Sequence, residues 1–188
     1  LSGGPDSVAL LDALARVARR AGVTVVAAHL DHGIRSDSGA DADFCAELCE
    51  RLRLRLRSGK ARPSEEARRE GGLEEAARLA RFAFLRRVAR EESAAAILLG
   101  HTLDDQAETV LLRLLRGSGA LGLSAMKPWD GELLRPLLDT RRAQVLEHLD
   151  AQRLPFRQDL TNSDRAFLRN RVRLDLLPLL ERDFNPGV

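Results

Sequence analysis

The chain has 188 residues, of which 44% are hydrophobic and 31% charged, and its formal net charge is +2. This balance is typical of a soluble globular protein with room for one α/β domain, and no apolar run approaches the ~20 residues that a membrane span requires. Its two cysteines, Cys45 and Cys49, are too few for a tetrahedral metal site and lack the CxxC redox spacing. We therefore expect reduced thiols in a cytoplasmic protein.

The chain opens on a glycine-rich turn that leads into a helix. In "LSGGPDSVALL" two glycines precede an apolar pattern that predicts an amphipathic helix over residues 6–21. A turn of this kind directs backbone N–H groups and the positive end of the helix dipole at one point, which favours anion binding. An ordinary strand-to-helix turn with Asp6 or Ser7 as N-cap explains these residues equally well. Because only Leu1 precedes the turn, we expect a strand before it to be missing from this chain.

Strands and helices then alternate along the chain. In chain order the predicted elements are a strand at 23–32, a helix at 37–52, a strand at 51–58, a loop at 59–72, a helix at 73–92, a strand at 94–100, and helix 104–116, followed by strand 132–138, helix 140–153 and helix 165–182. This βαβ spacing predicts the α/β class, with a doubly wound parallel sheet and a short helical extension at the C-terminal end.

The segment "RLRLRLRS" at 51–58 alternates strictly between leucine and arginine. A strand with this pattern has one buried and one solvated face, as at the edge of a sheet. The arginine row is better explained as a charged edge that resists aggregation than as a nucleic-acid-binding stripe.

Three polar clusters follow positions where strands end or are expected to end. They are residues 2–7, "HLDHGIR" at 29–35 and "GHTLDDQAET" at 100–109. Each has a structural explanation, since Thr102 and Asp105 resemble a capping box and His101 suits a buried site. Ligands of open parallel sheets bind at the carboxyl ends of the strands, so the three clusters together favour a functional site.

The third cluster carries two carboxylates on one helix face, Asp105 and Glu108, which are three residues apart. Carboxylates held near a phosphate-binding turn are suitable ligands for Mg²⁺. The Walker pattern GxxxxGK[ST] is absent from the sequence, so transfer of a terminal phosphoryl group is not indicated.

These motifs carry a resemblance to a known family. "SGGPDS" is similar to the pyrophosphate-binding loop of the N-type ATP pyrophosphatases (the PP-loop superfamily). Together with "HLDHGIR", "ARFAFL", "GHTLDDQAETVLLRLLRGSG", "RPLL" and "DLTNSDRAFLRNRVR", it makes the chain resemble the tRNA(Ile)-lysidine synthetase family along nearly its whole length. The resemblance implies a Rossmann-like, adenine nucleotide alpha hydrolase domain over 1–139 and a helical extension over 140–188 that leads to RNA-binding domains beyond this chain.

The implied activity is that of an ATP-dependent ligase. The C2 oxygen of the wobble cytidine in tRNA(Ile) with a CAU anticodon is adenylated, pyrophosphate leaves, and the ε-amino group of L-lysine displaces AMP. The implied cofactors are ATP and Mg²⁺, no membrane is involved, and a homodimer is one expected assembly.

The resemblance also implies roles for individual residues. The residues expected to bind ATP are Ser2, Gly3, Gly4, Pro5, Asp6, Ser7 and His29, with Asp6 also contacting Mg²⁺. The expected catalytic residues are Asp6, Arg81, His101, Asp105 and Glu108, and those expected to bind RNA or the activated base are His32, Arg35, Arg169 and Arg173. Phe82 stands where the family often has tyrosine, so a hydroxyl role there is lost. Free lysine is mostly protonated near pH 7, and we expect His101, Asp105 or Glu108 to assist removal of that proton.

Two other functions compete with the ligase. A tRNA thiolase of the same superfamily also adenylates a base, but its paired cysteines are not matched by Cys45 and Cys49. A nucleotide sensor or RNA-binding module without catalysis needs the glycine turn, but it does not need the group formed by His101, Asp105 and Glu108.

Overall fold

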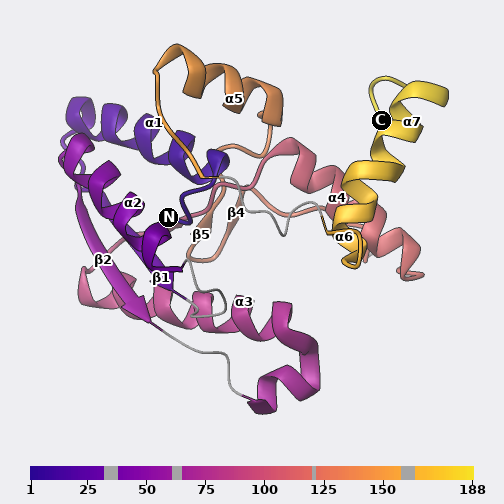
Figure 1. The fold of residues 1–188 in the computed structure, drawn as a ribbon, viewed down its shortest axis with the longest axis horizontal. Coiled ribbons are helices and arrows are strands. Elements are labelled where there is room, and N and C mark those ends of the chain that lie inside the picture. The colour runs from indigo at the N-terminus through magenta and orange to yellow at the C-terminus, as the bar shows by residue number, and fades with distance from the viewer. Residues whose placement is uncertain (32–37, 61–64, 120–121, 158–163) are drawn as a thin grey trace.

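The computed structural model describes residues 1–31, 38–60, 65–119, 122–157 and 164–188 (Figure 1). Its helices are α1 (Pro5–Ala21), α2 (Ser38–Leu52), α3 (Glu65–Glu91), α4 (Leu103–Leu115), α5 (Arg142–Ala151), α6 (Leu168–Arg171) and α7 (Leu177–Asp183), and its strands are β1 (Val26–Asp31), β2 (Arg55–Lys60), β3 (Ile97–Leu98), β4 (Trp129–Asp130) and β5 (Leu133–Leu134). Helices α1 and α5 lie on one side of the short strands and α3 on the other (Figure 1).

The strand pairs are mainly parallel. β1 pairs with β2 in parallel, with Val26 opposite Arg55, and β3 pairs with β5 in parallel, with Ile97 opposite Leu133. β4 pairs with β5 in the antiparallel direction. Parallel strands joined through helices that cover both faces confirm the predicted α/β class.

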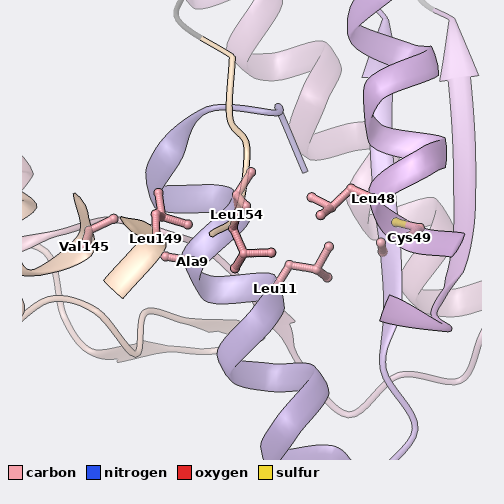
Figure 2. Packing of buried hydrophobic residues seen from close by; sticks show 9 residues of the cluster. Ala9, Leu11, Leu48, Cys49, Val145, Leu149 and Leu154 are labelled. Carbon is pink, nitrogen blue, oxygen red and sulfur yellow. The ribbon is translucent and has the colours of Figure 1, made fainter. Parts of the chain in front are cut away.

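Two hydrophobic clusters hold these elements together. The first joins α1, β1, α2, α5 and the segment after α5, and consists of Val8, Ala9, Leu11, Ala27, Leu48, Cys49, Val145, Leu149 and Leu154 (Figure 2). The second joins α3, β3 and β5 through Phe82, Ile97, Leu99 and Leu133. The first hydrophobic cluster therefore fixes the start of α1, which follows the first polar segment of the sequence. The second hydrophobic cluster fixes the end of β3, which precedes the third polar segment.

The first helix begins one residue earlier than predicted. Its N-cap is Gly4, which has no side chain to bond the first turn, and Pro5 occupies the first turn. Proline suits this position because the N–H it lacks would have no helical partner there. The alternative in which Asp6 or Ser7 caps the helix is therefore wrong, and both side chains are left for other contacts.

The predicted loop at 59–72 is partly wrong. α3 begins at Glu65 and is interrupted at Gly72, which has a left-handed φ of 76°. "EEARRE" at 65–70 consists of good helix formers, so this run forms a helix of its own before the glycine. The predicted helix at 73–92 matches the part of α3 that follows this interruption.

The strands are shorter than predicted. Residues 51–52 end α2, and β2 starts only at Arg55. The strand expected at 132–138 stops at Leu134, because Pro136 cannot donate to a ladder. The strand expected at 94–100 has only the length of its partner β5. β4 lies between the predicted helix at 104–116 and the predicted strand at 132–138, where no strand was predicted.

The last predicted helix, 165–182, is composed of three parts. It runs from Leu168 through α6, a π-helical turn at Val172–Leu176, and α7. Pro178 lies in the first turn of α7 and has no N–H for a regular helical bond to the preceding turn. A π-helical turn absorbs this irregularity, and such turns are frequent at functional sites.

The arginine row and the cysteines match their structural explanations. Arg55 and Arg57 are exposed and form ion pairs with Glu92 and Glu91 at the end of α3. Cys45 and Cys49 are free and buried, and burial raises the pKa of the Cys45 thiol to about 11. Within the described ranges, none of the helices combines the length and hydrophobicity needed to cross a membrane.

Candidate functional site

The glycine turn is held in shape by its own serines. The Ser7 hydroxyl donates to the Gly4 carbonyl at 2.8 Å and lies 3.2 Å from the Ser2 hydroxyl. Gly3 has a left-handed φ of 82°, and a Cβ added there would lie 3.3 Å from the ring of Phe44. A side chain at Gly3 would thus be strained by both its backbone angle and its neighbour. The turn is preformed at the N-terminus of α1, as an anion-binding turn requires.

Asp6 lies in the first turn of α1 with its two carboxylate oxygens in different surroundings. Oδ2 accepts a hydrogen bond from Arg142 Nη1 at 2.9 Å. Oδ1 is buried and has no hydrogen-bond partner among the described residues. Burial raises the pKa of Asp6, and the charge of Arg142 opposes this rise without cancelling it. Asp6 is a carboxylate with one oxygen left for a ligand.

The end of β3 lies directly against this turn. A Cβ added at Gly100 would lie 3.0 Å from the backbone carbonyl oxygen of Asp6, so any larger residue would have to displace the backbone of Asp6. His101 and Thr102 follow immediately, and α4 starts at Leu103. The structure therefore brings the third polar cluster of the sequence beside the glycine turn.

Asp105 belongs to a capping box at the start of α4. Its Oδ2 accepts hydrogen bonds from the Thr102 backbone N–H at 2.9 Å and from the Thr102 hydroxyl at 3.2 Å. The structural explanation of this pair is correct. The box also fixes the other oxygen, Oδ1, which accepts a hydrogen bond from Arg169 Nη2 at 2.7 Å.

Glu108 is fully buried, with 0% exposure, and is bound by two arginines. Its oxygens accept hydrogen bonds from Arg169 Nε at 2.6 Å and Arg173 Nε at 2.5 Å. Burial by itself would lower the pKa of Arg173, but the hydrogen bond and charge of Glu108 outweigh it, so this pKa is raised. Asp105 and Glu108 are thus balanced by two guanidinium groups from α6 and the π-helical turn, and the four residues form a carboxylate–arginine cluster.

His101 is neutral at pH 7. Burial lowers the pKa of His101 to about 4, Asp105 opposes this shift, and the charges of Arg135, Arg81 and Arg169 add to it. The Nδ1 atom is buried and has no hydrogen-bond partner in the described part of the chain. A neutral imidazole with an unpaired nitrogen beside the glycine turn can donate a hydrogen bond to a ligand or accept one from it.

The other residues that the sequence predicted for the site do not all lie beside the glycine turn. The guanidinium of Arg81 lies over the ring of Phe82 on α3, 5.5 Å from its centroid, and burial of the group and the charges of Arg78 and Arg169 lower the pKa of Arg81. His29 is buried, and its Nδ1 contacts the Leu1 carbonyl at 2.9 Å and the Cys45 thiol at 3.5 Å rather than the glycine turn. His32 and Arg35 lie outside the described residues.

Two arginines of the site have no role in the sequence-based prediction. Arg142 bonds Asp6 from the first turn of α5, and no local pattern marks it. Arg135 is 8% exposed, and its Nη1 donates to the Lys127 carbonyl at 2.7 Å, while its Nε has no hydrogen-bond partner in the ranges that the structure describes. Its place in the "RPLL" motif was a signal that could have drawn attention to it.

The side chains of the site limit the ways in which it could bind a metal ion. Among the described residues, no group of three or more His, Cys, Asp or Glu side chains is arranged to hold an ion. Mg²⁺ is often bound by one or two carboxylates together with substrate phosphates rather than by a protein cage. The unpaired Oδ1 of Asp6 beside the glycine turn fits that mode of binding.

A doubly wound α/β fold with a glycine turn at the start of its first helix defines a class of proteins that bind phosphates at a helix N-terminus. The chain belongs to the PP-loop domain family, whose model matches residues 1–180.

Curated relatives share the sequence along the whole chain. A tRNA(Ile)-lysidine synthase from Thermobifida fusca (strain YX) is 46% identical over 187 residues, which cover 100% of this chain and 57% of the relative. Proteins of the same name from Symbiobacterium thermophilum and Geobacter sulfurreducens are 43% and 44% identical, and this chain covers 40% of each. The chain thus spans between 40% and 57% of the length of these three relatives.

A solved structure has the same fold. The U34-tRNA thiolase NcsA from Methanococcus maripaludis, solved with its 4Fe-4S cluster, matches 100% of this chain and 66% of its own chain with a TM-score of 0.80. The two sequences are 21% identical, so this likeness shows the fold alone.

Proposed function

We propose that this chain is the catalytic domain of an ATP-dependent ligase that forms lysidine on tRNA(Ile) with a CAU anticodon. The C2 oxygen of the wobble cytidine attacks the α-phosphorus of ATP, the bond to the β-phosphate breaks, and pyrophosphate leaves. The ε-amino group of L-lysine then forms a bond to C2, AMP leaves, and the amine loses a proton. The names of the curated relatives and the PP-loop family support this reaction.

One observation carries the proposal. The end of β3 touches the first turn of α1 through Gly100 and Asp6, so the residues that follow β3 lie beside the glycine turn. A ligase needs a phosphate-binding turn next to groups that handle the second substrate, and these two parts meet here. A simple nucleotide-binding module would need only the turn.

In the first step, we assign the glycine turn and Asp6 to ATP. Negative charge develops on the departing pyrophosphate, and fixed N–H groups and arginines near it stabilise that charge without rearrangement. When bound, Mg²⁺ would be held by Asp6 Oδ1 and would supply further charge stabilisation. Arg81, whose charge acts at His101, is the arginine that we assign to the phosphates or the activated base.

In the second step, we assign the carboxylate–arginine cluster and His101 to lysine. An ammonium group that binds Asp105 or Glu108 must share them with Arg169 and Arg173, which occupy these carboxylates in the structure. His101 is the neutral group with an unpaired nitrogen, so we propose that it takes the proton of the amine after the bond to C2 has formed, when this proton is far more acidic than that of a free ammonium group. The guanidinium groups around it disfavour the charged imidazole, so the proton passes on to solvent. Arg169 and Arg173 then remain candidates for contact with RNA.

The test is pyrophosphate release by this chain with ATP, lysine and an unmodified transcript of tRNA(Ile). We expect release that depends on the wobble cytidine, together with a mass gain of one lysyl group on the tRNA. A transcript with uridine at the wobble position is the matched control and should release no pyrophosphate. ATP binding without release would favour the non-catalytic module, and sulfur transfer to tRNA would favour a thiolase.

We also propose a cytoplasmic location, where tRNA and ATP are available, and the homodimer stays a prediction.

Replacing His101 with alanine should slow the lysine step and spare the first step. At pH 7 we expect lysidine formation to fall by about 100-fold, because a positioned proton acceptor is lost, while pyrophosphate release persists. The loss should shrink as the pH rises to 9.5, because hydroxide can then take the proton of the bound amine without His101. Single-turnover assays that follow pyrophosphate and lysidine separately measure both effects. A loss that stays constant with pH would refute the role as proton acceptor.

A further inference from the structure

Arg142 enters the glycine-turn site from a distant part of the chain. Its Nη1 donates to Asp6 Oδ2 at 2.9 Å, although the two residues are 136 positions apart. Its backbone N–H donates separately to Asp104 Oδ2 at 2.7 Å. The main chain of Arg142 is therefore anchored to the start of α4 while its side chain reaches the start of α1.

Contacts other than the side chain of Arg142 also hold α5 in place. Val145 and Leu149 of the same helix are buried in the first hydrophobic cluster, and the backbone bond to Asp104 fixes the first turn. The ion pair is also accessible, since the side chains of Arg142 and Asp6 are 32% and 20% exposed. A guanidinium that lies outside the hydrophobic clusters and is reachable from solvent is available for a ligand.

The pair with Asp6 is incomplete as a structural ion pair. Buried carboxylates normally have both oxygens bonded, yet Asp6 Oδ1 is buried without a partner in the described part of the chain. Asp6 can accept a cation on this oxygen, and Arg142 can donate two hydrogen bonds to a phosphate. Guanidinium groups match phosphate oxygens better than any other side chain.

We propose that Arg142 is a phosphate-binding residue of the nucleotide site. Without nucleotide it balances the charge of Asp6. When Mg²⁺ and ATP bind, Asp6 takes the metal ion and Arg142 donates instead to the phosphates that leave as pyrophosphate. This inference rests on the proposed function only in naming ATP as the ligand. AMP lacks the phosphates concerned, so Arg142 distinguishes ATP from AMP.

The test compares Arg142→Gln with Arg153→Gln, a matched control just beyond the C-terminal end of α5, where Arg153 is exposed. Isothermal titration with Mg·ATP and with AMP gives both affinities for each variant. We expect Arg142→Gln to weaken Mg·ATP binding by about tenfold or more, as for the loss of a charged hydrogen bond, and to leave AMP binding unchanged. Arg142→Lys, which keeps the charge, should recover part of the loss, and Arg153→Gln should behave as the wild type.

Several outcomes separate this inference from the proposed function. Equal losses for Mg·ATP and AMP, or no loss for either, would overturn the role of Arg142 even if the wild type releases pyrophosphate on tRNA. A selective loss for Mg·ATP supports the role, and it does so even if the wild type binds ATP without consuming it, a result that would instead overturn the ligase. If Arg142→Gln does not fold, the affinities of Arg142→Lys decide the question. Lysine offers a point charge in place of the paired N–H donors of the guanidinium. Unaltered Mg·ATP binding by Arg142→Lys would therefore contradict phosphate binding through those paired donors.

Discussion

Replacing Glu108 with glutamine is expected to lower the free energy of unfolding by about 2–4 kcal/mol. The glutamate is fully buried, and both of its oxygens bind guanidinium groups from the C-terminal part of the chain. Glutamine offers one oxygen and no charge, so Arg169 and Arg173 would compete for it and for Asp105. Urea unfolding followed by circular dichroism measures the loss, provided that the slope of the transition stays constant.

The matched control is Glu181→Gln, which removes an exposed carboxylate from α7. We expect that variant to remain within about 0.5 kcal/mol of the wild type. The double variant Glu108→Gln with Arg173→Gln should lose less than the sum of the two single changes, because each change already removes the shared interaction. Equal stability of Glu108→Gln and Glu181→Gln would show that the cluster does not hold α6 and the π-helical turn against α4.

Replacing Asp6 with asparagine is expected to abolish most of the first step without destabilising the fold. We expect pyrophosphate release to fall by at least about 100-fold, the size typical of removing one group that stabilises charge in a transition state. Asparagine keeps the shape of the side chain but loses the negative charge that would hold Mg²⁺ at Oδ1. The measurement is pyrophosphate release under saturating ATP at several Mg²⁺ concentrations.

The Asp6→Asn variant should lose activity but gain stability at pH 7. The pH dependence of this gain follows from the pKa of Asp6. Burial raises this pKa above its usual value of 3.8. The folded state therefore favours the protonated acid, and stability is lost as the pH rises through the raised pKa. At pH 7 the asparagine variant, which has no charge to bury, should be at least as stable as the wild type. Its advantage should vanish below pH 3.8, where Asp6 is protonated in both states.

Thermal unfolding at pH 7 and at pH 3.5 tests this sign, with Asp43→Asn on the exposed face of α2 as the control. The control should keep both activity and melting temperature. Full activity of Asp6→Asn would remove the basis for placing the metal ion and the phosphates at this carboxylate.

Local patterns in the sequence predicted most of the helices and the fold class. The apolar spacing after Asp6 and the capping box at Thr102 placed α1 and α4 to within one residue at their starts. The alternation of leucine and arginine predicted only the first part of β2, residues 55–58, where Leu56 packs on the first cluster while Arg55 and Arg57 stay exposed. The helical run at 65–70 was missed because residues 59–72 were predicted as a loop, and the π-helical turn was missed because residues 165–182 were predicted as one regular helix.

Most residues of the candidate site were predicted from the sequence, but the contacts between them were not. The glycine turn, His101 and the two carboxylates of α4 were identified from motifs and from the resemblance to a family. That Arg169 and Arg173 bind those carboxylates, and that Arg142 binds Asp6, was not predicted. A long-range ion pair leaves no local pattern, because its geometry depends on the packing of helices that are far apart in the sequence.

The sequence by itself determined most of the helical segments, where the glycine turn lies, and the family to which the chain belongs. Backbone preferences and the spacing of apolar residues act over a few positions, so they can be deduced from neighbouring residues. Only the tertiary structure decided the electrostatic state of the site: which arginine neutralises which carboxylate, which oxygen of Asp6 is left unpaired, and why His101 is neutral. These properties arise from burial and from charges brought together by folding, and both depend on the packing of the whole domain.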